Sequence, residues 1–279
     1  MTLSPPIEPN LSPPIEPAPT LLSAPIELAG KWGRMIPRSA QSVAERMRHA
    51  CLDGVRLISD RPPTKIRVDR HTSSGPPAVW LHPDGSSMAW IIVDTGERAW
   101  MQLAYQFGHE LGHVTANSWQ PHAKPLPPSQ WIEEALVEAF TLRGLGRLAE
   151  SWKTNPPFPG DNQFGEGIAK YRQNITRRYN KLAVAQGLTA DPATWFGNHR
   201  KEIEVPALNP FARAASLKVL DEYERAPDCV EALGALNRWP GRTGVSIEEY
   251  FRQWEASCVE LHANLQLPRR LREMWRIGQ

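Results

Sequence analysis

The segment 97–114 reads ERAWMQLAYQFGHELGHV. It contains no proline, and its apolar residues recur at spacings of three and four, which is typical of an amphipathic helix. His109 and His113 are four residues apart, so they project from one face of such a helix. Both imidazoles can then bind a single ion, and the sequence predicts a helix with a metal site on one face.

Glu110 completes the pattern His-Glu-x-x-His. In zinc peptidases a glutamate at this position is the general base that activates water. The alternative is a solvated helical face that carries histidine and glutamate without a metal. Gly108 and Gly112 weaken a helix by up to about 1 kcal/mol each relative to alanine. They favour the metal site, because they are explained if another backbone packs closely beside the histidines.

A catalytic zinc needs a third protein ligand and one open position for water. The expected source is a second helix, 131–140, with Ser129 as its N-cap. On the helical period Glu134 and Glu138 face packed protein, where a carboxylate is costly unless it is paired or binds a metal. We therefore assign Glu134 as the third zinc ligand and Glu138 as the acid that hydrogen-bonds a ligand imidazole. Glu133 lies on a different side and is expected to be a solvated charge.

These residues resemble those of the gluzincin metallopeptidases, which include thermolysin and the aminopeptidase N-like enzymes. The resemblance rests on His109-Glu110-x-x-His113, on the twenty residues that separate His113 from Glu134, and on the block WIEEAL around Glu134. An acid four residues after the liganding glutamate, here Glu138, also recurs in thermolysin-like enzymes. The resemblance covers about residues 97–145. It implies a zinc site of His109, His113 and Glu134 with Glu110 as base.

The chain departs from the aminopeptidase pattern at two places. The segment that begins at Phe211 resembles a helix that opens with a tyrosine in those enzymes, and that tyrosine helps to stabilise the oxyanion. Phe211 has no hydroxyl, so a donor would come from Tyr105, Tyr171, Tyr179 or an arginine, or be missing. The stretch 85–90 lacks the glutamate that binds a substrate amine. We therefore expect an endopeptidase rather than an aminopeptidase.

The predicted activity is zinc-dependent hydrolysis of peptide bonds, with Zn²⁺ as cofactor and a peptide or protein as substrate. Two alternatives stay open. One is a regulatory peptidase of the group that cleaves phage-type repressors, which shares His-Glu-x-x-His and a later Glu-Ala run. The other is a catalytically silent interaction module that keeps the zinc helix as a scaffold.

The segments around the motif predict an α+β fold. A small N-terminal mixed sheet leads into the zinc-site helices in a lobe over 31–160, and a mainly helical lobe covers 161–279. The last strand is expected to border the cleft, where an edge strand can pair with an extended substrate. The expected strands are 55–58, 65–68, 78–82 and 89–93. The expected helices outside the site are 39–51, 168–186, 210–225, 228–238 and 246–264.

Residues 1–30 are predicted to be a proline-rich, disordered tail. LSPPIEPN at 3–10 is followed at once by LSPPIEPA at 11–18, and SAPIEL at 23–28 repeats the pattern in part. Proline removes backbone donors and favours extended polyproline II, so such a segment forms no packed core. The alternative is a docking peptide for a proline-reading domain.

Composition limits the partners and the location. The net charge of +2 gives no argument for nucleic acid, and the basic end near Arg269 is interpreted as solvated surface. No apolar run approaches the roughly eighteen residues of a membrane span, and no secretory signal follows Met1. Cys51, Cys229 and Cys258 have no metal-binding spacing and are expected to be buried thiols. We therefore expect a protein of the reducing cytoplasm.

Overall fold

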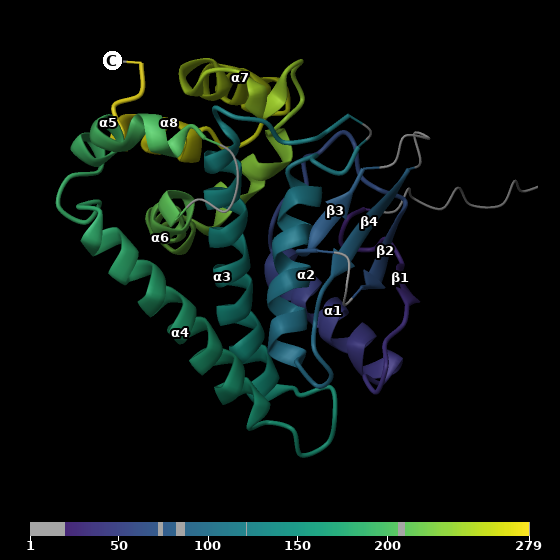
Figure 1. Cartoon of the computed structure of the whole chain (residues 1–279). Helices are drawn as coiled ribbons and strands as arrows, with labels where there is room; N and C mark the ends of the chain where they lie inside the picture. The colour runs from purple at the N-terminus through teal and green to yellow at the C-terminus, as the bar shows by residue number, and fades with distance from the viewer. Residues whose placement is uncertain (1–19, 72–74, 82–86, 121, 206–209, 279) are drawn as a thin grey trace, which may run out of the picture.

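The computed structural model describes residues 20–71, 75–81, 87–120, 122–205 and 210–278. A four-stranded mixed sheet lies near the N-terminus and helices make up most of the remaining chain (Figure 1). The predicted α+β class is confirmed. The strands are β1 (Ile26–Gly30), β2 (Lys65–Arg70), β3 (Ala78–Trp80) and β4 (Met88–Val93).

The strands are ordered β1-β2-β4-β3, with β1, β2 and β4 parallel and β3 antiparallel to β4. The expectation that the strand at 89–93 borders the cleft as an edge is wrong, because β4 pairs with β2 on one side and with β3 on the other. The edge strands are β1 and β3, and in β3 Val79 lies opposite Ile91 of β4. Residues 55–58, predicted as a strand, form none.

The partial third copy of the tail repeat forms β1, in which Ile26 lies opposite Ile66 of β2. The predicted tail is therefore too long, since residues 20–30 belong to the fold. The third copy has Ala24 and Leu28 where the full copies have proline, so it keeps backbone N–H groups that those copies lack. The two full copies lie outside the described residues, and so does the predicted docking to a proline-reading domain.

The central helices are arranged in layers beside the sheet (Figure 1). Helices α1 (Pro37–Leu52) and α2 (Trp100–Thr115) lie next to the sheet, and α3 (Gln130–Thr154) packs against both. Helices α4 (Phe164–Ala185) and α6 (Pro210–Arg225) pack against α3 from the other side. The remaining elements are α5 (Pro192–Ile203), the 3-10 helices η1 (Pro227–Ala235) and η2 (Arg242–Gly244), α7 (Ile247–Glu260) and α8 (Gln266–Met274).

Most predicted helices are present with shifted ends, but the C-terminal part differs in three places. The helix expected at 228–238 is the 3-10 helix η1, and both α5 and α8 were not predicted. Ser129 takes the N-cap position of α3, yet its hydroxyl donates to the carbonyl of Val245 instead of accepting from the helix. The buried apolar side chains form one connected cluster that includes both predicted lobes. The division into lobes at residue 160 stays a prediction.

Cys51, Cys229 and Cys258 are free and buried, as the sequence predicts. Within the described parts of the chain, none of the helices combines the length and the apolar character that a membrane crossing requires.

Candidate metal centre

The two histidines of the motif lie on α2 where it packs between α1 and α3. A Cβ atom on Gly112 would lie 2.7 Å from Cγ1 of Val137 on α3, and one on Gly108 would collide with the side chain of Met47 on α1. The glycines therefore let neighbouring helices approach α2 closely. The expectation that another backbone packs beside the two glycines is wrong, because the atoms nearest to them belong to the side chains of Met47 and Val137.

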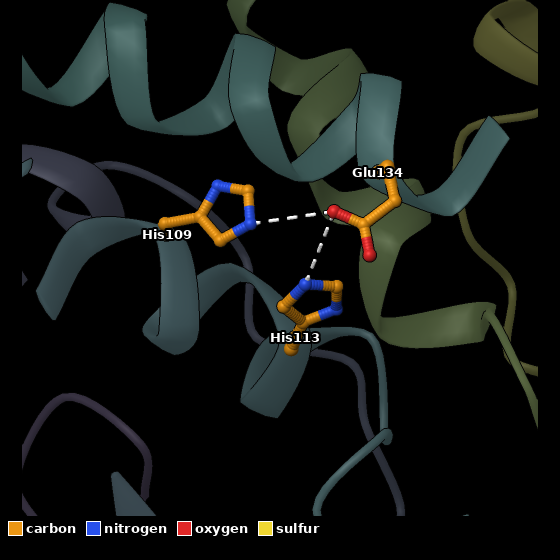
Figure 2. Close-up of side chains that lie close together, drawn as sticks. All are labelled: His109, His113 and Glu134. Carbon is orange, nitrogen blue, oxygen red and sulfur yellow. Dashed lines mark ion pairs between the residues drawn. The ribbon is translucent and has the colours of Figure 1, made fainter. Parts of the chain in front are cut away.

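His109, His113 and Glu134 converge on one point between α2 and α3 (Figure 2). Oε2 of Glu134 lies 3.4 Å from Nε2 of His109 and 3.7 Å from Nε2 of His113. All three ligand atoms lie within 4.8 Å of one another. In a tetrahedral zinc centre with bonds of about 2.1 Å, ligand atoms are separated by about 3.4 Å. The donor set and its spacing therefore fit zinc.

Each ligand imidazole is oriented by a carboxylate on α3. Nδ1 of His109 lies 3.1 Å from Oε2 of Glu138, and Nδ1 of His113 lies 2.8 Å from Oε1 of Glu133. Hydrogen bonds at Nδ1 fix the tautomer that presents Nε2 to a metal and increase the basicity of the ligand. The contact expected for Glu138 is present, and a second contact of the same kind is supplied by Glu133.

The prediction that Glu133 is a solvated charge is wrong, because its side chain is only 1% exposed. Its second oxygen accepts a hydrogen bond of 2.8 Å from Nδ2 of Asn237. The helical period of α3 separates Glu133 from Glu134, but it does not show that the segment after η1 covers that side. Asn237 was missed as well, because no sequence pattern links it to residues more than a hundred positions earlier.

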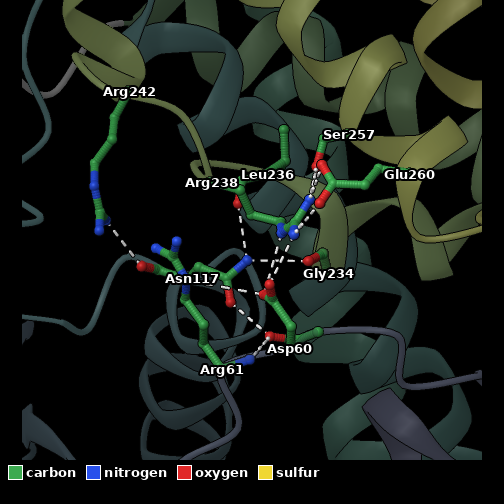
Figure 3. A network of polar contacts seen from close by, with 10 residues as sticks. Asp60, Arg61, Asn117, Gly234, Leu236, Arg238, Arg242, Ser257 and Glu260 are labelled. Carbon is green, nitrogen blue, oxygen red and sulfur yellow. Dashed lines mark hydrogen bonds and ion pairs between the residues drawn. The ribbon is translucent and has the colours of Figure 1, made fainter.

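A polar network holds the segment after η1 against the end of α2 (Figure 3). Nδ2 of Asn117 donates to the carbonyls of Gly234 and Leu236 at 3.0 and 2.8 Å. Arg242 donates to the carbonyl of Asn117 at 2.9 Å, while Arg238 pairs with Asp60 and Glu260. These contacts fix the backbone on both sides of Asn237 and thereby the donor that orients Glu133.

Two of the tyrosines proposed as oxyanion donors, Tyr105 and Tyr179, lie near Nδ1 of His109 and not near Nε2, the nitrogen that faces Glu134. The hydroxyl of Tyr105 donates to Glu138 at 2.8 Å, and the hydroxyl of Tyr179 lies 3.3 Å from that of Tyr105. Both hydroxyls therefore lie on the Nδ1 side of the imidazole. The ring of Tyr171 packs edge-on against Tyr105 at 6.2 Å. Phe211 packs against the rings of Trp195 and His199.

Glu110 is buried between the ligand residues and the edge strand β3. Burial raises the pKa of its carboxyl, although the charges of His109 and His113 oppose that shift. The charge of Glu134 raises the pKa further, and a hydrogen bond from the backbone N–H of Val79 lowers it. The charge of Glu110 thus interacts with His109, His113 and Glu134.

The surrounding carboxylates raise the pKa of both imidazoles and so favour their protonated forms. Burial by itself would lower the pKa of His109, but the hydrogen bonds to Glu134 and Glu138 raise that pKa to about 10. Burial would also lower the pKa of His113, but the charge of Glu134 and the hydrogen bonds to Glu133 and Glu134 raise it well above its ordinary value. A metal ion at this site would replace these protons.

No model of a known protein family matches the chain, and comparisons with curated proteins and with solved structures find no match.

Proposed function

We propose that the protein is a zinc-dependent peptidase that hydrolyses peptide bonds within a polypeptide. One observation carries the proposal: two imidazole nitrogens and a carboxylate oxygen lie at zinc-ligand spacing, and each imidazole is oriented by its own carboxylate. Two side chains of the ligand set, His109 and Glu134, are 20% and 34% exposed, which supports access for a substrate. The resemblance to the gluzincins supports the same assignment.

Zinc bound to His109, His113 and Glu134 would supply Lewis-acid chemistry, which acidifies water and polarises a carbonyl. Glu110 is the base: its buried carboxylate takes a proton from the attacking water and passes it to the leaving amine. Glu133 and Glu138 do not meet the substrate. They hold the two imidazoles in place.

The edge strand β3 supports an endopeptidase over an aminopeptidase. In an antiparallel pair, a residue whose N–H points away from its neighbour also points its carbonyl away. The N–H of Val79 donates to Glu110, so the peptide groups of Val79 face the metal centre and not β4. An extended peptide paired with this edge would pass Glu110 and continue in both directions.

One observation favours a second candidate, the catalytically silent zinc module. The hydroxyls of Tyr105 and Tyr179 lie beside Glu138, and Phe211 packs against other aromatic rings. None of these side chains therefore offers a donor on the Nε2 side of His109. The repressor-cleaving alternative and the cytoplasmic location also remain proposals; the three free, buried cysteines support the location.

The test compares the wild type with Glu110→Gln, using a fluorogenic peptide library and zinc analysis on the same samples. Glu150→Gln is the matched control, because the side chain of Glu150 is 73% exposed on α3. We expect Glu110→Gln to keep its zinc and to lose about 100- to 10,000-fold in rate, while the control keeps both. Wild type that holds zinc but cleaves nothing would favour the silent module, and an active Glu110→Gln would refute the role of the base.

A further inference from the structure

A cavity of about 640 Å³ lies between the end of α1 and helices α3, α4 and α6. Its volume is in the range of small-molecule sites. Three arginines line it, Arg143 and Arg147 from α3 and Arg172 from α4, together with Tyr223 from α6. We call it the arginine cavity. It is distinct from the metal centre, since Arg143 follows Glu134 by nine residues on α3, about 14 Å along the helix axis.

Two of these guanidinium groups, Arg143 and Arg147, form no direct ion pair with a carboxylate of the described residues. Arg143 is 8% exposed, and its hydrogen bond goes to the backbone carbonyl of Cys51 at 3.2 Å. Arg147 donates to the carbonyl of Asp53 at 2.8 Å. Throughout the described ranges neither arginine forms an ion pair with a carboxylate. Backbone carbonyls accept hydrogen bonds but leave a positive charge uncompensated, which is costly for a buried group.

The other charges around the cavity supply only part of that compensation: burial and the charge of Arg147 lower the pKa of Arg143, and the charge of Glu224, which raises it, does not outweigh them. Arg172 pairs with Glu224 at 2.5 Å and donates to the carbonyl of Leu142 at 2.8 Å. Glu150 is exposed and pairs with Lys153 at 2.8 Å. Asp53 is exposed and contributes its backbone carbonyl. Arg143 and Arg147, four residues apart on one helix, repel each other, and the charge of Arg147 adds to burial in lowering the pKa of Arg143.

Tyr223 gives a second, independent indication of a ligand. Its side chain is fully buried, and its hydroxyl has no hydrogen-bond partner among the residues that the structure describes. Burial raises the pKa of this hydroxyl, and the nearby charge of Arg143 opposes the shift. A buried hydroxyl without a partner costs about 1–3 kcal/mol. An acceptor atom in the cavity would satisfy Tyr223 and neutralise Arg143 together.

We propose that the arginine cavity binds a small phosphate-type anion, either inorganic phosphate or a phosphomonoester. Arg143 and Arg147 supply the charge, and Tyr223 supplies a hydroxyl donor. Guanidinium groups pair with phosphate oxygens through two parallel hydrogen bonds. Two positive charges and a hydroxyl match a dianion with three acceptor oxygens better than a monocarboxylate, which would neutralise only one charge.

The alternative is that Arg143 and Arg147 serve only to cap the C-terminal carbonyls of α1. Capping uses one donor group on each guanidinium and predicts no saturable anion binding. It also predicts that loss of Arg147 lowers stability equally with and without phosphate. If the arginine cavity binds phosphate, Arg147→Gln should lose more stability relative to wild type when phosphate is present than when it is absent.

The test measures the binding of inorganic phosphate and of glycerol phosphate to the full, zinc-loaded chain by calorimetry and thermal unfolding. Acetate and sodium chloride at equal ionic strength are the reference anions. The variants are Arg147→Gln and Tyr223→Phe, and the control is Arg177→Gln, an exposed arginine on α4. Comparing variants on the same zinc-loaded protein removes any contribution of phosphate at the metal.

We expect saturable binding of at least one phosphate compound, weakened tenfold or more by Arg147→Gln and about threefold to tenfold by Tyr223→Phe, and unchanged in the control. Tyr223→Phe should unfold at the same or a higher temperature than wild type without phosphate, so lost binding would not reflect misfolding. Tighter binding of inorganic phosphate would identify free phosphate as the ligand, and tighter binding of glycerol phosphate would identify a phosphomonoester. Stabilisation no greater than that by chloride, equal binding of acetate, or equal losses in Arg147→Gln and Arg177→Gln would overturn the proposal.

Discussion

Replacing Glu133 with alanine should weaken zinc binding although Glu133 does not touch the metal. Its carboxylate accepts from Nδ1 of His113 at 2.8 Å and from Nδ2 of Asn237 at 2.8 Å. The variant leaves Nδ1 of His113 without that acceptor, so the imidazole loses both its fixed orientation and part of its basicity. Asn237 still donates to the carbonyl of Ala116 and to Oγ of Ser118, and it is not orphaned.

The expected loss of affinity is about 10- to 100-fold, the usual effect of removing a partner of a metal-ligating histidine, or about 1.4–2.7 kcal/mol. Glu133→Gln should lie between wild type and Glu133→Ala. Its amide oxygen can still accept from His113, but its NH₂ group then faces the NH₂ group of Asn237, and two donors repel.

Competition with a chelating dye would measure the zinc affinity of wild type, both Glu133 variants and Glu150→Ala. Circular dichroism in the presence of chelator would show that each variant folds. A Glu133→Ala variant that binds zinc within twofold of wild type would refute the reasoning. So would a loss of the same size in Glu150→Ala, because that side chain is exposed and pairs only with Lys153 in the described chain.

Three further predictions concern protons and packing. The pKa of His109 without metal is about 10, above its ordinary value of 6.5. The stability that His109 contributes is therefore complete below about pH 6.5 and is lost as the pH rises toward 10. The unfolding temperature of chelated protein should fall over that range, and an unfolding temperature that does not change with pH would contradict this. Zinc displaces these protons, so its affinity should rise with pH and its binding should release protons, which calorimetry in buffers of different ionisation enthalpy measures; zinc binding without proton release would be inconsistent with the site. Gly112→Ala should destabilise the protein by about 1–3 kcal/mol in urea unfolding, because its Cβ would lie 2.7 Å from Val137. This overpacking outweighs the gain in helix propensity of about 1 kcal/mol. A variant more stable than wild type would contradict the packing of α2 against α3.

The parts of the fold and the site that sequence predicts are those fixed by local periodicity. The helix that carries His109 and His113 follows from apolar spacing within sixteen residues of α2. The motif spacing selects Glu134 as the residue that joins the two histidines, but the helical period misjudges burial on α3, since the side chain of Glu134 is 34% exposed and that of Glu133 only 1%. The α+β class follows from short β-rich runs that precede long helical ones.

The parts that sequence misses depend on contacts between distant segments. Glu133 is buried because Asn237 and its neighbours cover that side of α3, and the period of a single helix carries no information on such a partner. Strand order is equally non-local: β2 pairs in parallel with β4 and not with β3, the next strand along the chain. The segment around Arg269 was expected to be a solvated basic surface because four of the nine residues of α8 are charged, yet Leu267, Pro268 and Leu271 are buried in the structure.

Elemental analysis of the purified chain, compared among wild type, Glu110→Gln, His113→Ala and Glu150→Ala, tests whether two neighbouring helices build a zinc site. We predict one zinc per chain in wild type, in Glu110→Gln and in the Glu150→Ala control, and a substantial loss of zinc in His113→Ala. Wild-type protein without stoichiometric zinc after purification in zinc-containing medium, or a His113→Ala variant that keeps a full equivalent, would contradict the site.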